Sequence, residues 1–244
     1  DSFGRTADAN FTSGYFDIEF TNGSPMSSIT DDDTVINGLT QTSYSGNTNT
    51  GALGAGGTAV GVSDIVLPSY ERPEIQVHRN EGDVFKTSGS NITIRDLSVF
   101  SRNNAAIRAD GGSLNIVGNI IGVDAEGNSD GNIRTGVSNL GADILIDGNY
   151  ITTLRDYAIL LDGGTSNVIS NNHLENNGSS ACDDAILLSA NASGIRIEQN
   201  LIENSASMAI DGEINNGNVL ITENSITTSG QDGGNCSGGP QQMA

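Results

Sequence analysis

The stretch DILIDGNYI, residues 143–151, alternates aliphatic and polar side chains, turns at Gly148 and Asn149, and resumes with a second apolar pair. Five other segments match it: NITIRDLSV (91–99), SLNIVGNII (113–121), NVISNNHL (167–174), GIRIEQNLI (194–202) and NVLITENSI (218–226). The six segments align on six anchor positions, which are Leu97, Asn119, Asn149, Asn172, Asn200 and Asn224. The third residue before every anchor is isoleucine, and the second residue after it is always aliphatic. Strands that are not structural repeats would not keep the same residue type at these aligned positions, which are called columns here.

The anchors lie 22, 30, 23, 28 and 24 residues apart, and a second short strand follows each of the first five. These strands are AAIRA (105–109), TGVSN (135–139), YAILL (157–161), DAILL (184–188) and MAIDG (208–212). The two long spacings come from insertions in one turn, because the strands themselves stay in register. Short strands that recur every 22–24 residues are typical of one coil of a parallel β-helix. A leucine-rich repeat would need leucines and a helical return segment, which these Gly/Asn/Ser turns do not favour.

Asparagine occupies five of the six anchors. It tolerates the left-handed backbone conformation of a tight corner, and its amide can bond to the asparagine one coil away. We therefore predict a structural ladder, and no active site, at Asn119, Asn149, Asn172, Asn200 and Asn224.

The I-x-x-N-x-I coils and the loop GNIIGVDAEGN (118–128) resemble the right-handed parallel β-helix repeats of bacterial secreted and surface proteins in the pectate-lyase-like superfamily. This resemblance implies an all-β, right-handed parallel β-helix (solenoid) with an N-terminal capping or donated strand. It leaves the function open, because that superfamily holds lyases, hydrolases, epimerases, adhesins and structural proteins. We expect an N-terminal strand segment at 1–34, the β-helix at 35–227 with a long loop at 42–73, and a Gly-rich tail at 228–244.

The chain of 244 residues carries a net charge of −20 and a single lysine. Such a field repels phosphate backbones, so nucleic acid is not expected as a partner. No apolar run approaches the ~20 residues of a membrane span. The negative charge suits a saline, extracellular setting, although halophilic cytosolic proteins also stay soluble through a high negative charge. Asp1 stands in place of an initiator methionine, which is compatible with a removed leader, and we expect an extracellular or cell-surface location.

An acidic loop spaces Asp124, Glu126, Asn128 and Asp130 in the manner of calcium ligands. An EF-hand loop that starts at Asp124 would need a bidentate carboxylate eleven residues on, where Thr135 stands. We therefore expect no cofactor and a polar turn insertion, with calcium as the alternative.

No catalytic constellation is complete in the sequence. Asp183–Asp184 suggests a polygalacturonase-like hydrolase, but the Gly-His-Gly and Arg-x-Lys that this resemblance requires downstream are missing. A lyase needs a base and cationic partners for a uronate carboxylate, and Lys86 with Arg108, one coil apart, is the best candidate pair. A solvated strand face is the alternative for both. We predict a protein without catalysis, with a polysaccharide lyase as runner-up and a glycan-binding adhesin module as a third hypothesis.

Two features suggest self-association. GYFDIEF (14–20) alternates Phe16, Ile18 and Phe20 with acidic residues, so it either covers the first coil or is donated to a neighbouring molecule. Alternation also places Leu160 and Leu187 outside, beside a column of small residues: Ala106, Gly136, Ala158, Ala185 and Ala209. This strip is suited to lateral packing, unless a loop or the N-terminal segment covers it.

The two cysteines, Cys182 and Cys236, fall on the same side of the coils. An even cysteine count in a chain expected outside the cell favours a disulfide, and the alternative is two free thiols in a reducing cytosol. The tail after Ile226 has no helical cap, as in a polymerising subunit or a fragment of a larger surface protein. Together these features predict a structural protein of the cell surface or extracellular matrix that self-associates into filaments by coil stacking.

Overall fold

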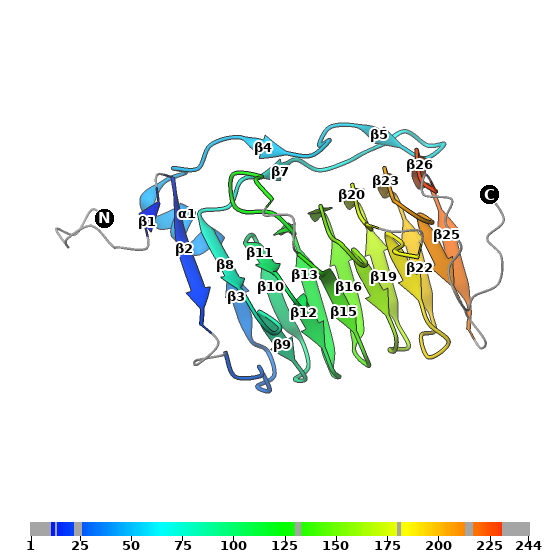
Figure 1. Cartoon of the computed structure of the whole chain (residues 1–244), viewed down its shortest axis with the longest axis horizontal. Coiled ribbons are helices and arrows are strands. Elements are labelled where there is room, and N and C mark those ends of the chain that lie inside the picture. The colour runs from blue at the N-terminus through cyan, green and yellow to red at the C-terminus, as the bar shows by residue number, and fades with distance from the viewer. Residues whose placement is uncertain are drawn as a thin grey trace.

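The computed structural model describes residues 11–12, 14–21, 26–129, 133–179, 182–212 and 217–230. Its strands wind into coils that stack along one axis (Figure 1). Successive strands enter three parallel sheets in turn, called here sheets A, B and C. The predicted all-β parallel β-helix is therefore confirmed. No helix in the described residues is long and apolar enough to cross a membrane.

Sheet A contains nine strands in spatial order: β1 (Phe11–Thr12), β2 (Tyr15–Phe20), β8 (Ile75–Arg79), β11 (Ser98–Ser101), β14 (Ile120–Ile121), β17 (Tyr150–Thr152), β20 (His173–Glu175), β23 (Leu201–Glu203) and β26 (Ser225–Thr227). The pair β1–β2 is antiparallel, and from β2 onward each described pair is parallel.

Sheet B contains β9 (Phe85–Thr87), β12 (Ala105–Ala109), β15 (Thr135–Asn139), β18 (Ile159–Leu161), β21 (Ile186–Leu188) and β24 (Ile210–Gly212). Sheet C contains β3 (Val35–Asn37), β10 (Ile92–Arg95), β13 (Ser113–Val117), β16 (Asp143–Asp147), β19 (Asn167–Ser170), β22 (Ile195–Glu198) and β25 (Val219–Thr222). Helix α1 (Leu39–Ser45) follows β3. Two antiparallel pairs lie outside the coils, β4 (Ala52–Leu53) with β7 (Tyr70–Glu71), and β5 (Ala59–Val60) with β6 (Ile65–Val66).

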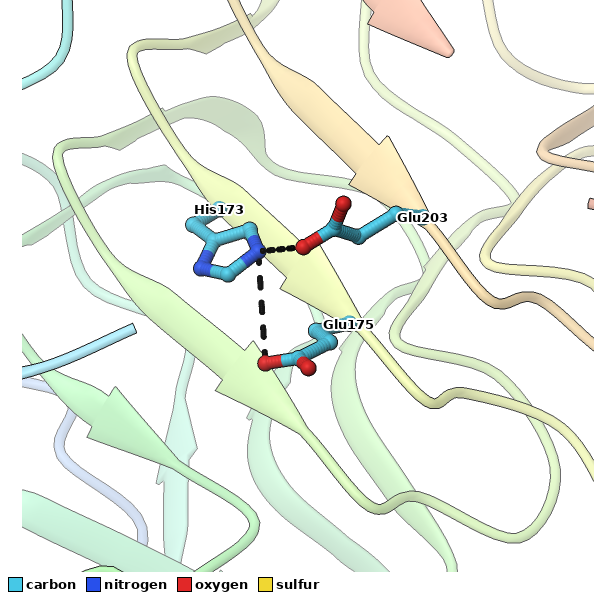
Figure 2. A group of neighbouring side chains, drawn as sticks. All are labelled: His173, Glu175 and Glu203. Carbon is cyan, nitrogen blue, oxygen red and sulfur yellow. Dashed lines mark hydrogen bonds and ion pairs between the residues drawn. The ribbon is translucent and has the colours of Figure 1, made fainter. Parts of the chain in front are cut away.

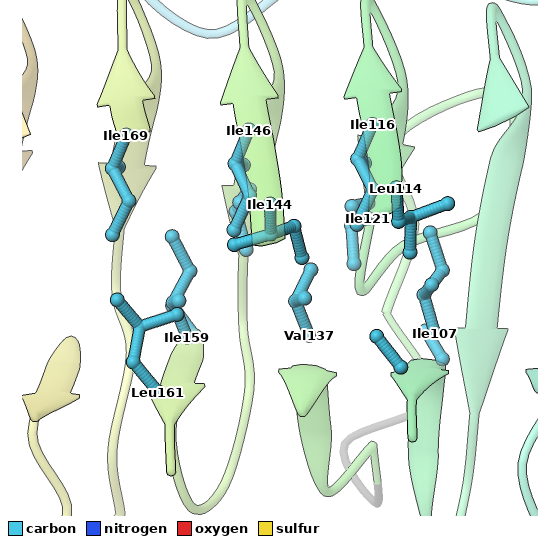
Figure 3. Packing of buried hydrophobic residues seen from close by; sticks show 14 of the residues in the cluster. Ile107, Leu114, Ile116, Ile121, Val137, Ile144, Ile146, Ile159, Leu161 and Ile169 are labelled. Carbon is cyan, nitrogen blue, oxygen red and sulfur yellow. The ribbon is translucent and has the colours of Figure 1, made fainter. Parts of the chain in front are cut away.

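The isoleucine columns form the core between the three sheets (Figure 3). The column before the anchors pairs in register from Ile94 through to Ile221, as the alignment predicted. Its members in the first five coils are fully buried: Ile94, Ile116, Ile146, Ile169 and Ile197. Each buried aliphatic side chain of this size contributes about 1.5–3 kcal/mol of transfer free energy, so the stack is held chiefly by these columns.

The asparagine ladder is present at the turn between sheet C and sheet A. Each side-chain amide donates to the Oδ1 of the next asparagine, at 3.1, 2.9, 3.0 and 2.9 Å from Asn119 to Asn224. The same amides also donate to isoleucine carbonyl oxygens, such as that of Ile146 at 2.8 Å from Asn172. A second pair, Asn139 and Asn167 (3.0 Å), was not predicted because it does not recur in every coil.

The left-handed backbone residue at this turn is not the anchor asparagine. It is the residue before the anchor, with φ between 55° and 66° at Asp96, Gly118, Gly148, Asn171, Gln199 and Glu223. The prediction that asparagine occupies the anchor to supply this conformation is therefore wrong. The anchor is asparagine because a buried corner needs a donor and an acceptor for the neighbouring coils.

The column of small residues faces the core, which corrects the predicted apolar strip. Ala106, Ala158 and Ala185 are completely buried. Ala158 and Ala185 stand at a bend immediately before β18 and β21, whereas Ala106 is the second residue of β12. The isoleucine that follows each of them is also completely buried, so two consecutive side chains point inward there. A Cβ on Gly136 would lie 2.5 Å from the carbonyl oxygen of Ala158, so this corner has room only for small residues. Leu160 and Leu187 do lie opposite one another on the outer face of sheet B, each half-buried.

The N-terminal strand β2 pairs in parallel with β8 of the same chain. Phe16, Ile18 and Phe20 lie opposite Ile75, Val77 and Arg79. Ile29 then bridges to Thr87 of sheet B, and β3 pairs with β10 in sheet C. These three segments form the first coil, so β2 covers β8 within one molecule and the sheets begin before residue 35.

Candidate functional site: the strap, its histidine and the coil ends

A segment of residues 46–73, called here the strap, crosses the outer face of sheet A along the solenoid (Figure 1). Near its start, buried Asn49 donates from Nδ2 to the carbonyl oxygen of Ala125 at 2.9 Å. The strap tip is the hairpin β5–β6, residues 59–66. There the Gly61 N–H donates to Ser225 Oγ at 3.1 Å. The strap therefore fastens coils that are far apart in the sequence. The sequence predicted a loop in this region but gave no signal for its path.

Apolar side chains also hold the strap on sheet A. The cluster consists of Val60, Leu67 and Tyr70 from the strap and Ile120, Val123, Tyr150 and Leu201 from the coils. Tyr70 OH donates to the carbonyl oxygen of Asn171 at 3.0 Å. Burial raises the pKa of the Tyr70 phenol, and the nearby Asp147 adds to this rise. Tyr70 is thus a neutral packing group and a hydrogen-bond donor.

His173 lies beneath the middle of the strap, and its side chain is 2 % exposed. Its Nδ1 accepts a hydrogen bond from the Ala55 N–H at 3.0 Å. Its Nε2 lies 3.0 Å from Glu203 Oε1 and 4.0 Å from Glu175 Oε2 (Figure 2). Because Nδ1 is an acceptor, the ring proton is on Nε2, which donates it to Glu203.

These three side chains offer one nitrogen and two carboxylate oxygens within 4.8 Å of one another, a donor set that suits a divalent metal ion. A metal-bound histidine, however, donates its other ring N–H to an acceptor. At His173 that other nitrogen instead faces the Ala55 N–H donor. The arrangement therefore does not fit a metal ion, and the histidine serves to hold the strap. Gly54 permits the close approach, since a Cβ there would lie 2.6 Å from His173 Nδ1.

Lys86 and Arg108, the candidate lyase pair, do lie together, but both form ion pairs with Asp110. Lys86 and Arg108 lie opposite one another on β9 and β12. Lys86 Nζ lies 2.9 Å from Asp110 Oδ2, and Arg108 Nε donates to Asp110 Oδ1 at 2.7 Å. Burial tends to raise the pKa of Asp110, but the hydrogen bonds from Arg108 and Lys86 lower it overall. A lysine paired with a carboxylate is a poor proton acceptor, so this geometry favours a structural ion pair.

Asp184 is covered by the coil that follows it. It is 3 % exposed, and the Met208 N–H donates to its Oδ1 at 2.8 Å. Burial raises the pKa of Asp184; the Met208 hydrogen bond opposes this rise, and Asp211 and Asp183 reinforce it. A carboxyl group so covered does not present an acid to a polymeric substrate, so the geometry does not favour the hydrolase hypothesis.

Replacing Asp184 with asparagine is expected to stabilise the fold at neutral and alkaline pH. Asparagine keeps the acceptor for Met208 and removes the buried negative charge. Because the folded pKa is raised, the protonated wild-type carboxyl stabilises the fold below the unfolded pKa of about 3.9, and this stability is lost as the pH rises through the folded pKa. The Tm should rise by about 2–4 °C under alkaline conditions, or about 1 kcal/mol, and by less in acid. The half-buried neighbour changed by Asp183→Asn is the control; a gain independent of pH would contradict the argument.

In the acidic loop that suggested calcium, the carboxylate of the first residue, Asp124, binds groups of the loop itself. Asp124 Oδ1 accepts from the Glu126 N–H at 2.9 Å and from the Asn128 N–H at 2.7 Å. Its Oδ2 accepts from Asn128 Nδ2 at 3.1 Å. The carboxylate therefore faces into the turn, as in an Asx-turn. Asp130 lies outside the described residues, and the geometry of the other three does not support the calcium hypothesis.

Cys182 is partly buried in the long connection between β20 and β21, where the anchor spacing predicted an insertion. Cys236 lies outside the described residues. The disulfide between the two stays a prediction.

A cavity of about 270 Å³ is lined by residues of β2, β8 and β11 and of the acidic loop. The ring of His78 stacks on Phe100 with centroids 4.9 Å apart, and its Nε2 lies 3.0 Å from Asp17 Oδ1. Arg102 and Asp124 also line the cavity. No sequence motif indicates this group, because its members come from the first four coils.

At the C-terminal side, the last described coil exposes the core columns. Ile221 lies in register with Ile197, and Ile226 lies in register with Ile202. Ile197 and Ile202 are fully buried, whereas Ile221 and Ile226 are 49 % and 48 % exposed. The surface that is sealed between neighbouring coils elsewhere is therefore accessible at this coil.

Other exposed large apolar side chains also lie at the two ends of the solenoid. Ile18, Val35 and Leu39 belong to the first coil and α1, and Leu220 belongs to the last coil. Val62 and Val66 lie at the strap tip, which binds Glu223 of the last coil through the Ser63 N–H at 2.9 Å. Among the described residues, Leu140 is the one such side chain on the body of the solenoid.

The fold and its inter-coil ladder define a parallel β-helix protein. A family model described as a right-handed beta helix region matches residues 82–243, about two thirds of the chain. The chain therefore belongs to the right-handed β-helix family. No curated protein and no solved structure matched it.

Proposed function

We propose that this chain is a non-catalytic structural protein of the cell surface or extracellular matrix that self-associates by coil stacking. The observation that carries the proposal is the exposure of Ile221 and Ile226, whose column neighbours are fully buried. Half-exposed core positions are apolar surface suited to a partner of matching shape. A coil surface is matched by another coil.

The polar groups that were candidates for catalysis each bind another group of the same chain. Lys86 and Arg108 bind Asp110, and buried Asp184 accepts from Met208. His173 holds the strap over the outer face of sheet A. This use of the polar groups supports a structural role over catalysis.

The proposed location is outside the cell, in a bacterial secreted or surface protein of the pectate-lyase-like superfamily. The net charge of −20, the paired cysteine count and the resemblance of the repeats support this location. The expected partners are further copies or a larger surface assembly, and acidic polymers are disfavoured by the like charge.

A glycan-binding adhesin module is the second candidate function. It is favoured by the cavity beside His78, which combines an aromatic pair with Asp17 and Arg102. Its volume of about 270 Å³ is near the lower end of the range for ligand pockets, about 300–1,000 Å³.

Incubation with alginate and with pectate, with and without calcium, is expected to give no unsaturated-uronate absorbance. The ion pairs with Asp110 make Lys86 and Arg108 poor acceptors for the proton α to the carboxylate. Product that is lost in Lys86→Ala or Arg108→Ala, but retained in the exposed control Arg196→Ala, would contradict the structural proposal. Binding without product, abolished by Arg102→Ala, would favour the glycan-binding module.

A further inference from the structure

The end of the last coil repeats an interface that the molecule already contains. Among the described residues, strands β24, β25 and β26 are the final members of sheets B, C and A. Each pairs on one side with the preceding coil, as β25 does with β22. A partner for the other side must bring parallel strands about 4.8 Å away and cover Ile221 and Ile226. The coils of this chain have that geometry.

The first coil offers the complementary surface. β3 is the outermost strand of sheet C, and Val35 on it is 60 % exposed. Ile18 on β2 and Leu39 on α1 add further apolar surface, at 39 % and 42 % exposed. The strand β1 pairs only with Tyr15 and Phe16 of β2, so the rest of β2 has no strand beyond it in the described part of the chain.

The strap tip enlarges the surface at the opposite end. Val62 and Val66 are 93 % and 64 % exposed, and the hairpin that carries them is fixed to the last coil through Glu223 and Ser225. Apolar side chains lie at both ends, and apart from the two-residue strand β1 the described strands of all three sheets run in the same direction. One molecule can therefore continue the sheets of another.

Resting on the structural function proposed above, we propose that the last coil of one molecule receives the first coil of a second copy. The contact joins two different surfaces, β24–β26 with the strap tip on one side and β2, β3 and α1 on the other. A head-to-tail contact between different surfaces propagates into an open chain of subunits when its rotation does not close a ring.

Both surfaces are acidic, which sets the salt dependence of the contact. Asp211 and Glu223 lie at the last coil, and Glu19 and Asp31 to Asp33 lie at the first. These charges repel when the ends approach. The repulsion is screened as the Debye length falls from about 30 Å at 0.01 M salt to about 3 Å at 1 M, so association should strengthen with salt.

The test is sedimentation velocity of the intact chain at low and at high salt, with two single-face variants. Ile221→Lys blocks the last coil and Val35→Lys blocks the first, and each alone should be monomeric in high salt. Mixed together, they should form a species of twice the subunit mass and nothing longer. Leu140→Lys, on the body of the solenoid, should assemble like the wild type, and melting curves establish that each variant is folded.

A wild-type chain that stays monomeric at high salt would overturn the head-to-tail contact. Dimers of Val35→Lys alone would also overturn it, because they would join two identical ends. A monomeric wild type would also remove self-association from the proposed function. Both results leave the non-catalytic structural role standing as long as no uronan product forms. Turnover of a uronan would instead refute the structural function.

Discussion

Replacing Ile146 with asparagine is expected to lower the free energy of unfolding by about 4 kcal/mol. Ile146 is fully buried and lies between Ile116 and Ile169 in the core column. The substitution removes most of the transfer free energy of the isoleucine and places an amide among aliphatic side chains that offer it no partner. Chemical denaturation followed by circular dichroism measures the change, which is a large part of the ~5–15 kcal/mol that stabilises a typical domain.

The adjacent residue provides the matched control. Leu145 lies on the same strand, β16, and its half-buried side chain points to the outer face of sheet C. Leu145→Asn should therefore cost about 1 kcal/mol or less, because water reaches the new amide. Equal losses for the two variants would show that the column at Ile146 does not face the core.

The core columns could be predicted because a β-helix repeats its environment. A residue such as Ile146 contacts the equivalent residues one coil away, so the same side chain recurs at the same place in the repeat. The anchor ladder follows the same logic, since Asn149, Asn172 and Asn200 each contact an asparagine in the coil before and in the coil after. The alternation of apolar and polar residues, combined with the spacing between coils, was therefore sufficient to predict both the core columns and the ladder.

The corner residues were placed on the wrong side because alternation fails where the backbone bends. Ala158 and Ile159 are consecutive, yet both are completely buried. Period-2 reasoning assumes an extended strand, and Ala158 lies before the first residue of β18. The side chain is small at this position because the corner is narrow. In the sequence alone, the same small residues fit a flat exposed strip equally well.

The strap could not be predicted because its contacts have no repeat. Ala55 binds His173, and Gly61 binds Ser225, across 118 and 164 residues of sequence. Neither partner carries a motif that indicates the other. His173 in particular occupies a column position that holds Tyr150 and Leu201 in neighbouring coils, so its role depends on what lies above it.

Replacing Asn172 with leucine is expected to destabilise the fold by about 3–5 kcal/mol although the two side chains have the same branched arrangement of heavy atoms. Asn172 Oδ1 accepts from the backbone N–H of Asn149 at 2.8 Å, and its Nδ2 donates to the carbonyl oxygen of Ile146 at 2.8 Å. Leucine leaves both buried backbone groups without a partner, at about 1–3 kcal/mol each, and breaks the ladder on either side.

Asn224 separates the effect of burial from that of the ladder bond itself. It makes the equivalent contacts, accepting from the Asn200 N–H at 3.0 Å and donating to the Ile197 carbonyl oxygen at 2.8 Å. It is half-buried in the last coil, whereas Asn172 is completely buried. Water can therefore hydrate the groups that Asn224→Leu leaves behind, and this variant should lose about 1 kcal/mol. If both variants lost the same amount in denaturant titrations, the ladder would owe its stability to side-chain packing. A much larger loss at Asn172 would show that its role is to satisfy backbone groups in a corner that water does not reach.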